Sequence, residues 1–127
     1  MGGEALMSRY AASATHVYVI DAGDMAKVGA SSHIRRRVTQ IVNSYGNMMG
    51  GRKMRLHAAW EINGAGKIET AARKALAANF DRWSVDWFMT DAVSASALVE
   101  KAMRDFGYDP VAAIRDFGVL PIPGRGR

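Results

Sequence analysis

Residues 16–41 constrain the fold of this 127-residue chain more than any other stretch, because they predict a strand, a tight turn, a second strand and a helix in direct succession. Positions 17–20 form a β-branched and aromatic run, which is typical of strands. Positions 21–24, Asp-Ala-Gly-Asp, favour a turn. A loop of two or four residues here pairs positions whose numbers sum to 45 and sets Tyr18 opposite Lys27 on one face. A three-residue loop would slip the register and separate them.

The helix that follows has both a start signal and an apolar face. Ser31 or Ser32 can cap it, because a hydroxyl oxygen accepts hydrogen bonds from the free N–H groups of the first turn. Arg36 is expected to face water, whereas Arg37 lies on the border of the apolar stripe, where its long side chain can reach along the sheet. The stripe at helical spacing consists of Ile34, Val38, Ile41, Val42 and Tyr45.

The rest of the chain supplies a third strand and further helices. Period-two alternation predicts a strand over 54–62 that joins the hairpin in a small, mainly antiparallel three-stranded sheet. Helices are expected over 67–79, 91–106 and 110–117, and a short buried segment over 85–89. The predicted fold class is therefore α+β, with a sheet flanked by helices and extra helices at the C-terminal end. The apolar face of the strand is Met54, Leu56, Ala58, Trp60 and Ile62, and the packing stripe of the 91–106 helix is Val93, Ala97, Leu98, Ala102 and Phe106.

The chain is expected to form one domain, because 127 residues are enough to bury a core without disulfides or structural metals. Residues 1–13 are expected to form a flexible N-terminal arm, and residues 14–91 the core. Residues 92–118 then add a helical extension of the same domain, and the Pro/Gly/Arg-rich residues 119–127 a disordered tail.

Composition excludes several classes of site. Cysteine is absent, so disulfides and thiolate-held metals do not contribute, and no two of the three histidines lie at the spacing of zinc ligands on one helix. No apolar run approaches the length of a membrane span, and the N-terminus lacks a secretory pattern. We therefore expect a cytoplasmic protein with no membrane association. The net charge of +5 favours an anionic partner, with nucleic acid ahead of a membrane surface.

Two groups of basic residues are candidate phosphate contacts. Arg35 and Arg36 lie in the first helix, and Arg52, Lys53 and Arg55 lie between the Gly-rich loop and the third strand. Positive side chains hold the nucleic-acid backbone without reading its sequence. A surface kept soluble by its charge explains the same residues, so both interpretations stay open at this point.

The order of these elements resembles the GIY-YIG nuclease superfamily, in particular its branch in phages and mobile elements. The first signature corresponds to residues 16–18, His-Val-Tyr, in which only the tyrosine is kept. The second corresponds to residues 27–29, Lys-Val-Gly, with lysine where many members have tyrosine. Arg37 matches the family arginine ten positions after the start of the second signature, and Glu69 matches the glutamate of a later helix. The acidic-Trp-Phe element of that branch is matched by residues 86–88.

This resemblance implies a GIY-YIG-like fold over residues 14–91 and an endonuclease that hydrolyses phosphodiester bonds in nucleic acid, with DNA the expected form. It implies dependence on Mg²⁺, or on Mn²⁺ in its place, with Glu69 as the metal ligand. Arg37 would bind the scissile phosphate, while Tyr18 and Lys27 would lie near the attacking water. Asp86 is expected to anchor its segment. Specificity is expected from loops, tails, a partner protein or a second copy of the chain.

Each of these residues also has a plain structural interpretation. Glu69 and Arg73 stand at i, i+4 and would make an ordinary exposed pair. Tyr18 would be a strand aromatic, and Lys27 a solvated strand lysine. Two alternative functions follow from these interpretations: a nucleic-acid-binding module without catalytic activity, or a structural or assembly protein of a phage particle.

Overall fold

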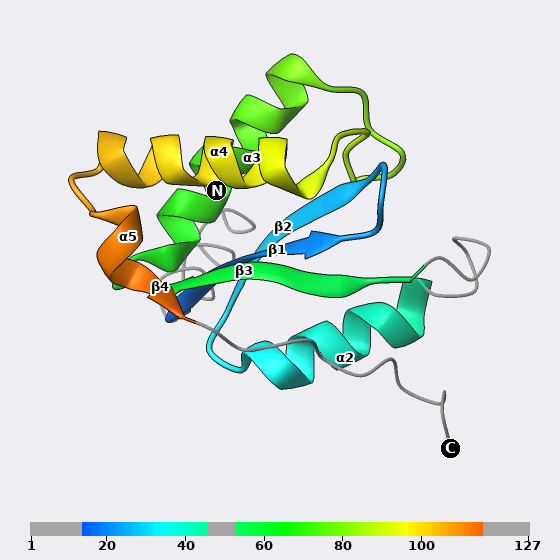
Figure 1. Cartoon of the computed structure of the whole chain (residues 1–127), viewed down its shortest axis with the longest axis horizontal. Coiled ribbons are helices and arrows are strands. Elements are labelled where there is room, and N and C mark those ends of the chain that lie inside the picture. Colours follow the sequence, from blue (N-terminus) through cyan, green and yellow to red (C-terminus); the bar gives the residue numbers. More distant parts are fainter. Residues whose placement is uncertain (1–13, 46–52, 116–127) are drawn as a thin grey trace, which may run out of the picture.

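In a computed structural model, the chain folds into an antiparallel sheet with helices on both faces, and the structure describes residues 14–45 and 53–115 (Figure 1). The order of strands in the sheet is β2-β1-β3-β4. Helix α2 covers one face, and α3 and α4 cover the other (Figure 1). The α+β class with a three-stranded antiparallel core, β1 to β3, is confirmed. The elements are β1 His16–Asp21, β2 Ala26–Ser31, α2 Ile34–Tyr45, β3 Arg55–Glu61, α3 Ala65–Asn79, α4 Ala92–Asp105, α5 Pro110–Ala113 and β4 Ile114–Arg115.

The predicted hairpin forms, but the predicted register differs from the observed one by two positions. Tyr18 pairs with Gly29, and Lys27 pairs with Ile20. The turn is centred on Gly23 and Asp24, and Gly23 has a φ of 89°, a conformation that glycine adopts without strain. A shift by two keeps every side chain on its original face. Tyr18 and Lys27 therefore share a face as expected, but they are diagonal neighbours.

Local hydrogen bonds and burial explain why the turn lies further along the chain. The Ala22 N–H donates to the Met25 carbonyl oxygen at 3.0 Å, and the Gly23 N–H donates to Asp21 Oδ1 at 2.8 Å. Ala22 and Met25 are both buried in the core on the α2 side of the sheet. The backbone hydrogen bond closes a two-residue turn between Ala22 and Met25, and this turn sets the observed register.

Helix α2 follows its sequence pattern closely. The His33 N–H donates to Ser31 Oγ at 2.9 Å, so Ser31 stabilises the entry to the helix. Arg36 is exposed, as expected. Arg37 is exposed as well, rather than covered along the sheet, although it interacts with Tyr18. The buried stripe is confirmed for Ile34, Val38, Ile41 and Val42, and nothing is described for the side chain of Tyr45.

A bulge in β3 divides the apolar face that the sequence pattern predicts. Val19 pairs with Ala58 but Ile20 pairs with Leu56, so His57 is an extra residue without a direct partner. An extra residue reverses the alternation beyond it. Met54 and Leu56 consequently pack on the α2 side, whereas the later positions of the predicted face pack toward α3 and α4. The prediction of a single apolar face for residues 54–62 is therefore wrong.

Helix α4 buries a different stripe from the predicted one. Val93 and Phe106, expected in the core, are exposed. Small side chains allow the helix to approach the sheet and α3 closely, and this close contact sets its rotation. The buried residues are Ala92, Ala95, Val99, Ala102 and Met103, so only Ala102 belongs to both sets.

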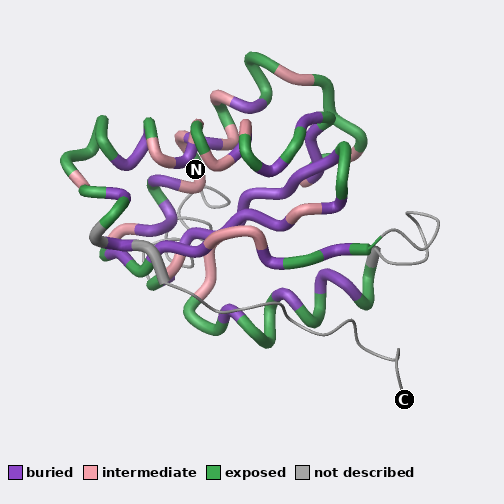
Figure 2. Tube along the Cα trace, viewed as in Figure 1, coloured by how far each residue is buried: buried purple, intermediate pink, exposed green. Residues whose placement is uncertain are grey.

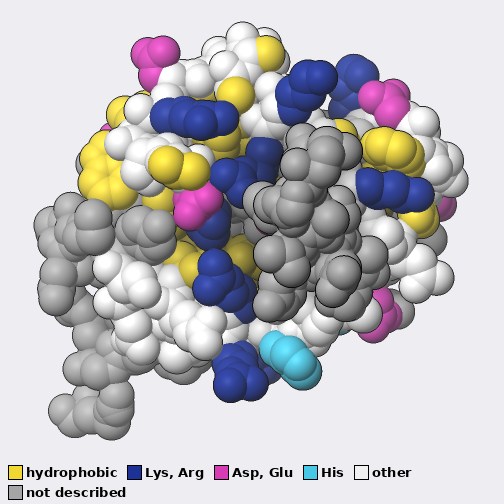
Figure 3. All heavy atoms as spheres, turned by 180° about the vertical axis from the view of Figure 1, so that it is seen from behind, with side chains coloured by type: hydrophobic (Ala, Val, Ile, Leu, Met, Phe, Trp, Pro, Cys, Tyr) yellow, Lys and Arg dark blue, Asp and Glu magenta, His cyan; other side chains and the backbone are white. Residues whose placement is uncertain are grey.

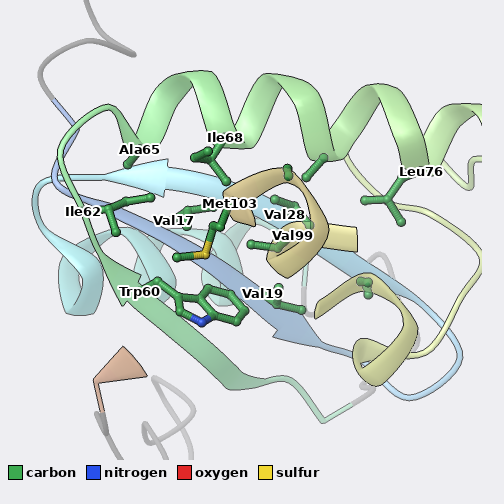
Figure 4. Close-up of a cluster of buried hydrophobic side chains, with 14 of the residues drawn as sticks. Val17, Val19, Val28, Trp60, Ile62, Ala65, Ile68, Leu76, Val99 and Met103 are labelled. Atoms are coloured by element: carbon green, nitrogen blue, oxygen red, sulfur yellow. The ribbon is translucent and has the colours of Figure 1, made fainter. Parts of the chain in front are cut away.

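The sheet is buried on both faces, as Figure 2 shows for its central strands. The larger core lies between the sheet and the pair α3 and α4, and it extends from the hairpin to α4 (Figure 4). Residues 92–105 therefore share one hydrophobic core with the N-terminal strands. The side chains that Figure 4 labels in this core are Val17, Val19, Val28, Trp60, Ile62, Ala65, Ile68, Leu76, Val99 and Met103.

The ends of the other elements differ from expectation in smaller ways. Helix α3 begins two residues earlier than predicted, after Gly64 with a φ of 77°. The predicted helix over 110–117 ends at Ala113, because Ile114 pairs with Trp60 and starts the two-residue strand β4. The N-terminal arm, the Gly-rich loop and the C-terminal tail lie outside the described residues. None of the helices in 14–45 and 53–115 is long and apolar enough to cross a membrane.

Candidate active site

Four elements bring the predicted residues together around the outer edge of the sheet. Tyr18 comes from β1 and Lys27 from the edge strand β2. Arg37 reaches the same place from α2, and Glu69 from α3. The four side chains are also close enough to interact electrostatically, because Arg37 and Glu69 both influence the pKa values of Tyr18 and Lys27. In Figure 3, Lys and Arg side chains gather along the middle of one face with an acidic side chain beside them.

Tyr18 is held in the core with its hydroxyl beside Gly29. Only 1% of its surface is exposed, and a Cβ added at Gly29 would collide with the hydroxyl and the ring. Glycine at this point of β2 therefore makes the room that the tyrosine occupies. Burial raises the pKa of Tyr18 to about 12, although the Arg37 charge and an Arg37 hydrogen bond act in the opposite direction. The hydroxyl keeps its proton at neutral pH.

Lys27 is a buried ammonium with a carboxylate partner. It is 4% exposed, and its Nζ lies 3.8 Å from Asp86 Oδ2. Burial lowers the pKa of Lys27, Asp86 opposes that effect most strongly, and the charges of Arg73 and Arg37 add to it. The prediction that Lys27 lies close to the other site residues holds, whereas the interpretation as a solvated lysine is wrong.

Glu69 is half-buried and lies at the edge of β2. Burial raises the pKa of this carboxyl, while the nearby cations Arg73 and Lys27 and a hydrogen bond from the Ala30 N–H lower it. The Ala30 hydrogen bond ties α3 to the outer strand. Glu69 is therefore a half-buried carboxylate between cations, and the interpretation of Glu69 and Arg73 as an ordinary exposed pair is wrong.

Two residues outside the predicted site, Arg73 and Asp86, complete this cluster. Arg73 Nη2 donates to Asp86 Oδ1 at 3.0 Å and to the Val85 carbonyl oxygen at 3.2 Å. Asp86 matched a family motif and Arg73 stood one turn after Glu69, but no local pattern indicates that the two pair with each other. Their contact depends on the segment 82–88 folding back against β2.

The candidate phosphate contacts have different environments. Arg35, Arg36 and Lys53 are exposed, so their side chains lie where a phosphate backbone can approach. Arg55 is exposed but its Nε lies 3.1 Å from Asp21 Oδ2, an ion pair that joins the ends of β3 and β1. Arg52 lies outside the described residues.

The cluster supplies few ligands for a metal ion. Within residues 14–45 and 53–115, no group of three or more His, Asp or Glu side chains is placed to hold a metal. Glu69 is the carboxylate best placed to do so, because the oxygens of Asp86 face Lys27 and Arg73. Mg²⁺ fits such a site, since it is often held by one carboxylate while waters and substrate phosphates complete its shell.

Fold and site together define a small α+β domain with a carboxylate and several cations around one sheet edge. The chain belongs to the T5orf172 domain family, whose profile matches residues 15–110. This domain occurs in phage and mobile-element proteins and is related to the GIY-YIG/HNH-like nucleases, although no specific GIY-YIG match accompanies it. The chain matches no curated protein and no solved structure. The resemblance is thus supported at the level of this related family, which suggests a nuclease or nucleic-acid-related role.

Proposed function

We propose that the protein is a Mg²⁺-dependent endonuclease that hydrolyses phosphodiester bonds, with DNA the expected substrate. One observation carries the proposal: a carboxylate, a phenol, an ammonium and a guanidinium from four elements meet at the edge of β2. Cleavage of a phosphodiester requires a positioned and activated water and positive charge near the developing negative charge. The cluster contains a group for each requirement.

Arg37 is the residue we assign to the scissile phosphate. It is exposed and comes from the helix that also presents Arg35 and Arg36, so one helix would both attract the backbone and bind the reacting group. A guanidinium matches the geometry of two phosphate oxygens. Its charge also acts on Tyr18, so a phosphate held by Arg37 would lie next to the phenol.

Tyr18 and Lys27 would act on the attacking water and on the charge that develops when it attacks. Because its pKa is about 12, Tyr18 stays protonated at neutral pH and would orient the attacking water by a hydrogen bond. Lys27 is an ammonium beside Asp86 and would stabilise negative charge on the phosphate as the water attacks.

Glu69 would hold the Mg²⁺ ion, or Mn²⁺ in its place. When bound, such an ion stabilises negative charge on phosphate oxygens and lowers the pKa of its waters. Burial raises the pKa of Glu69, while the charges of Arg73 and Lys27 act against that effect and favour the ionised form that a cation requires.

A binding module without catalytic activity is the second candidate. The observation in its favour is that the two groups assigned to the water are almost completely buried, with Tyr18 1% and Lys27 4% exposed. If substrate binding does not open these groups, the basic surface would hold nucleic acid without cleaving it.

The test is a nicking assay on labelled DNA duplexes, single strands and RNA, with and without Mg²⁺ or Mn²⁺. Glu69→Gln and Arg37→Ala are each expected to lower the rate by about 10²–10³-fold, because each removes charge stabilisation in the transition state. Lys74→Ala, an exposed change on the same helix as Glu69, serves as the control and should retain the rate. Wild-type binding without metal-dependent cleavage would reject the endonuclease in favour of the module.

A further inference from the structure

The segment 82–88 is fastened to the outer edge of β2 by backbone and side chains. Ala26 and Phe88 exchange two backbone hydrogen bonds, each 3.0 Å long. Trp87 and Phe88 are fully buried, and they belong to the cores on opposite faces of the sheet. The backbone at Asp86 is thus held in place directly beside Lys27.

The carboxylate of Asp86 is shared between two cations from different elements. Oδ2 lies 3.8 Å from Lys27 Nζ of β2, and Oδ1 accepts from Arg73 Nη2 of α3 at 3.0 Å. Arg73 also donates to the Val85 carbonyl oxygen at 3.2 Å, so its guanidinium holds both the backbone and the side chain of this segment. Both bonds come from one guanidinium nitrogen, so Arg73 links the carboxylate of Asp86 to the backbone of its own segment.

A buried ammonium needs a negative partner, and two carboxylates compete for that role. The charged and titratable groups that act on Lys27 are Asp86, Arg73, Arg37 and Glu69, and Tyr18 lies diagonally across from it in the hairpin. If Asp86 were neutral, Glu69 would be the carboxylate left near Lys27. A Glu69 carboxylate engaged by Lys27 is a poorer ligand for a cation.

We propose that Asp86 and Arg73 are positioning residues: Asp86 holds the Lys27 ammonium away from Glu69, and Arg73 holds Asp86. This inference rests on the proposed function for its catalytic consequence. Its structural part, the placement of Lys27 by Asp86, stands on the contacts alone. Neither residue needs to touch the substrate.

The test compares Asp86→Asn, which removes the charge at nearly constant shape, with Asp86→Glu, which keeps the charge. Asp105→Asn is the matched control, because it removes the charge from an exposed pair with Lys101 at 2.9 Å. We expect Asp86→Asn to lower kcat on the order of 10–100-fold, to raise the Mg²⁺ concentration needed for half-maximal rate, and to leave KM for DNA within about twofold. Asp86→Glu should recover part of kcat, and Asp105→Asn should match the wild type.

A second readout does not require activity. The side-chain ¹³Cε–¹⁵Nζ resonance of Lys27, assigned by its loss in Lys27→Met, should move in Asp86→Asn toward the shifts of exposed lysines and stay in place in Asp105→Asn. If the wild type does not nick, the proposed function fails, while this resonance still decides whether Asp86 positions Lys27. Should Asp86→Asn fail to fold, Arg73→Lys replaces it and should move the same resonance less. An unmoved Lys27 resonance, or an Asp86→Asn protein with wild-type kcat, would overturn the inference.

Discussion

The pairing of Tyr18 with Gly29 connects the two signatures of the hairpin physically. The tyrosine ring occupies the space that a side chain at position 29 would fill. The two residues therefore depend on each other: β1 supplies the tyrosine ring, and the glycine of β2 leaves the space that the ring occupies. Burial in that gap gives Tyr18 its raised pKa, and it also keeps the hydroxyl protonated under ordinary conditions.

At this residue scale we predict a loss of stability in alkaline solution that depends on Tyr18. The native pKa is about 12, above the ordinary value of 10.0, so between these pH values the unfolded chain releases a proton that the native protein keeps. The stabilisation is fully present below pH 10 and is lost toward pH 12, in total on the order of 2–3 kcal/mol. Urea titrations from pH 9 to 12 should show this component in the wild type and not in Tyr18→Phe. Identical pH dependence in both proteins would contradict it.

At the scale of elements, the segment 82–88 determines how the sheet edge is closed. An edge strand with free N–H and C=O groups is open to pairing with other chains, and this segment occupies part of the β2 edge. The same pairing places Asp86 beside Lys27. Stability of the edge and geometry of the site are therefore coupled through one short stretch of chain.

We predict that Phe88→Ala weakens this closure strongly. The side chain is fully buried in the core shared with α3 and α4, so its loss should cost about 3–5 kcal/mol of unfolding free energy. Hydrogen exchange at the amides of Ala26 and Phe88 should accelerate at the same time, since they hold the two strands together. Denaturant titration and exchange by NMR measure the two effects.

The matched control for that substitution is Phe106→Ala. Phe106 is exposed at the C-terminal end of α4, where the Lys67 Nζ lies 5.2 Å from its ring centroid. Losing such a surface contact should cost less than about 1 kcal/mol and leave the exchange of Ala26 unchanged. Equal destabilisation by the two substitutions would show that the edge contact has no special role.

At the scale of the whole molecule, one positively charged surface is that of helix α2, which has three arginines and no acidic residue. The net charge is +5, and α2 presents Arg35, Arg36 and Arg37 on the face opposite α3 and α4 (Figure 1). A phosphate backbone approaching that side would meet three cations before it meets the half-buried Glu69. Such an arrangement would steer an anionic polymer to the site edge.

We predict that nucleic-acid affinity falls with salt and that Arg36→Ala reduces this dependence. Each phosphate contact contributes close to one unit to the slope of log affinity against log salt, so the slope should decrease by about 1. Arg104→Ala, an exposed change on α4, removes the same charge from the other side of the sheet and should leave the slope unchanged. Fluorescence anisotropy with a labelled duplex over a salt series measures both. Equal slopes for Arg36→Ala and the wild type would exclude Arg36 as a phosphate contact.

Much of the framework could be predicted from the sequence, because its signals are local. The β-branched run of β1, the glycine turn and the four buried positions of α2 each follow from periodicity or from side-chain chemistry over a few residues. The shared face of Tyr18 and Lys27 was also predictable, since a slip of two positions preserves the face.

Features that depend on contacts between distant segments were decided by the tertiary structure. The hairpin register is set by a turn whose flanking residues Ala22 and Met25 pack in the core on the α2 side, and the bulge at His57 lies in a sheet that packs on both faces. The rotation of α4 likewise depends on which small side chains meet the sheet and α3. Local sequence carries periodicity, but it does not specify which of several apolar faces finds a partner.

The same distinction between local sequence and tertiary structure applies to the candidate site. The sequence alone determined the chemical groups of Tyr18, Lys27, Arg37 and Glu69 and the elements that bear them. Only the tertiary structure placed Asp86 between Lys27 and Arg73, because that contact joins β2, α3 and a returning segment far apart along the chain. Burial, and with it the protonation of the phenol and the ammonium, is a property of how those elements pack, and no single element contains it.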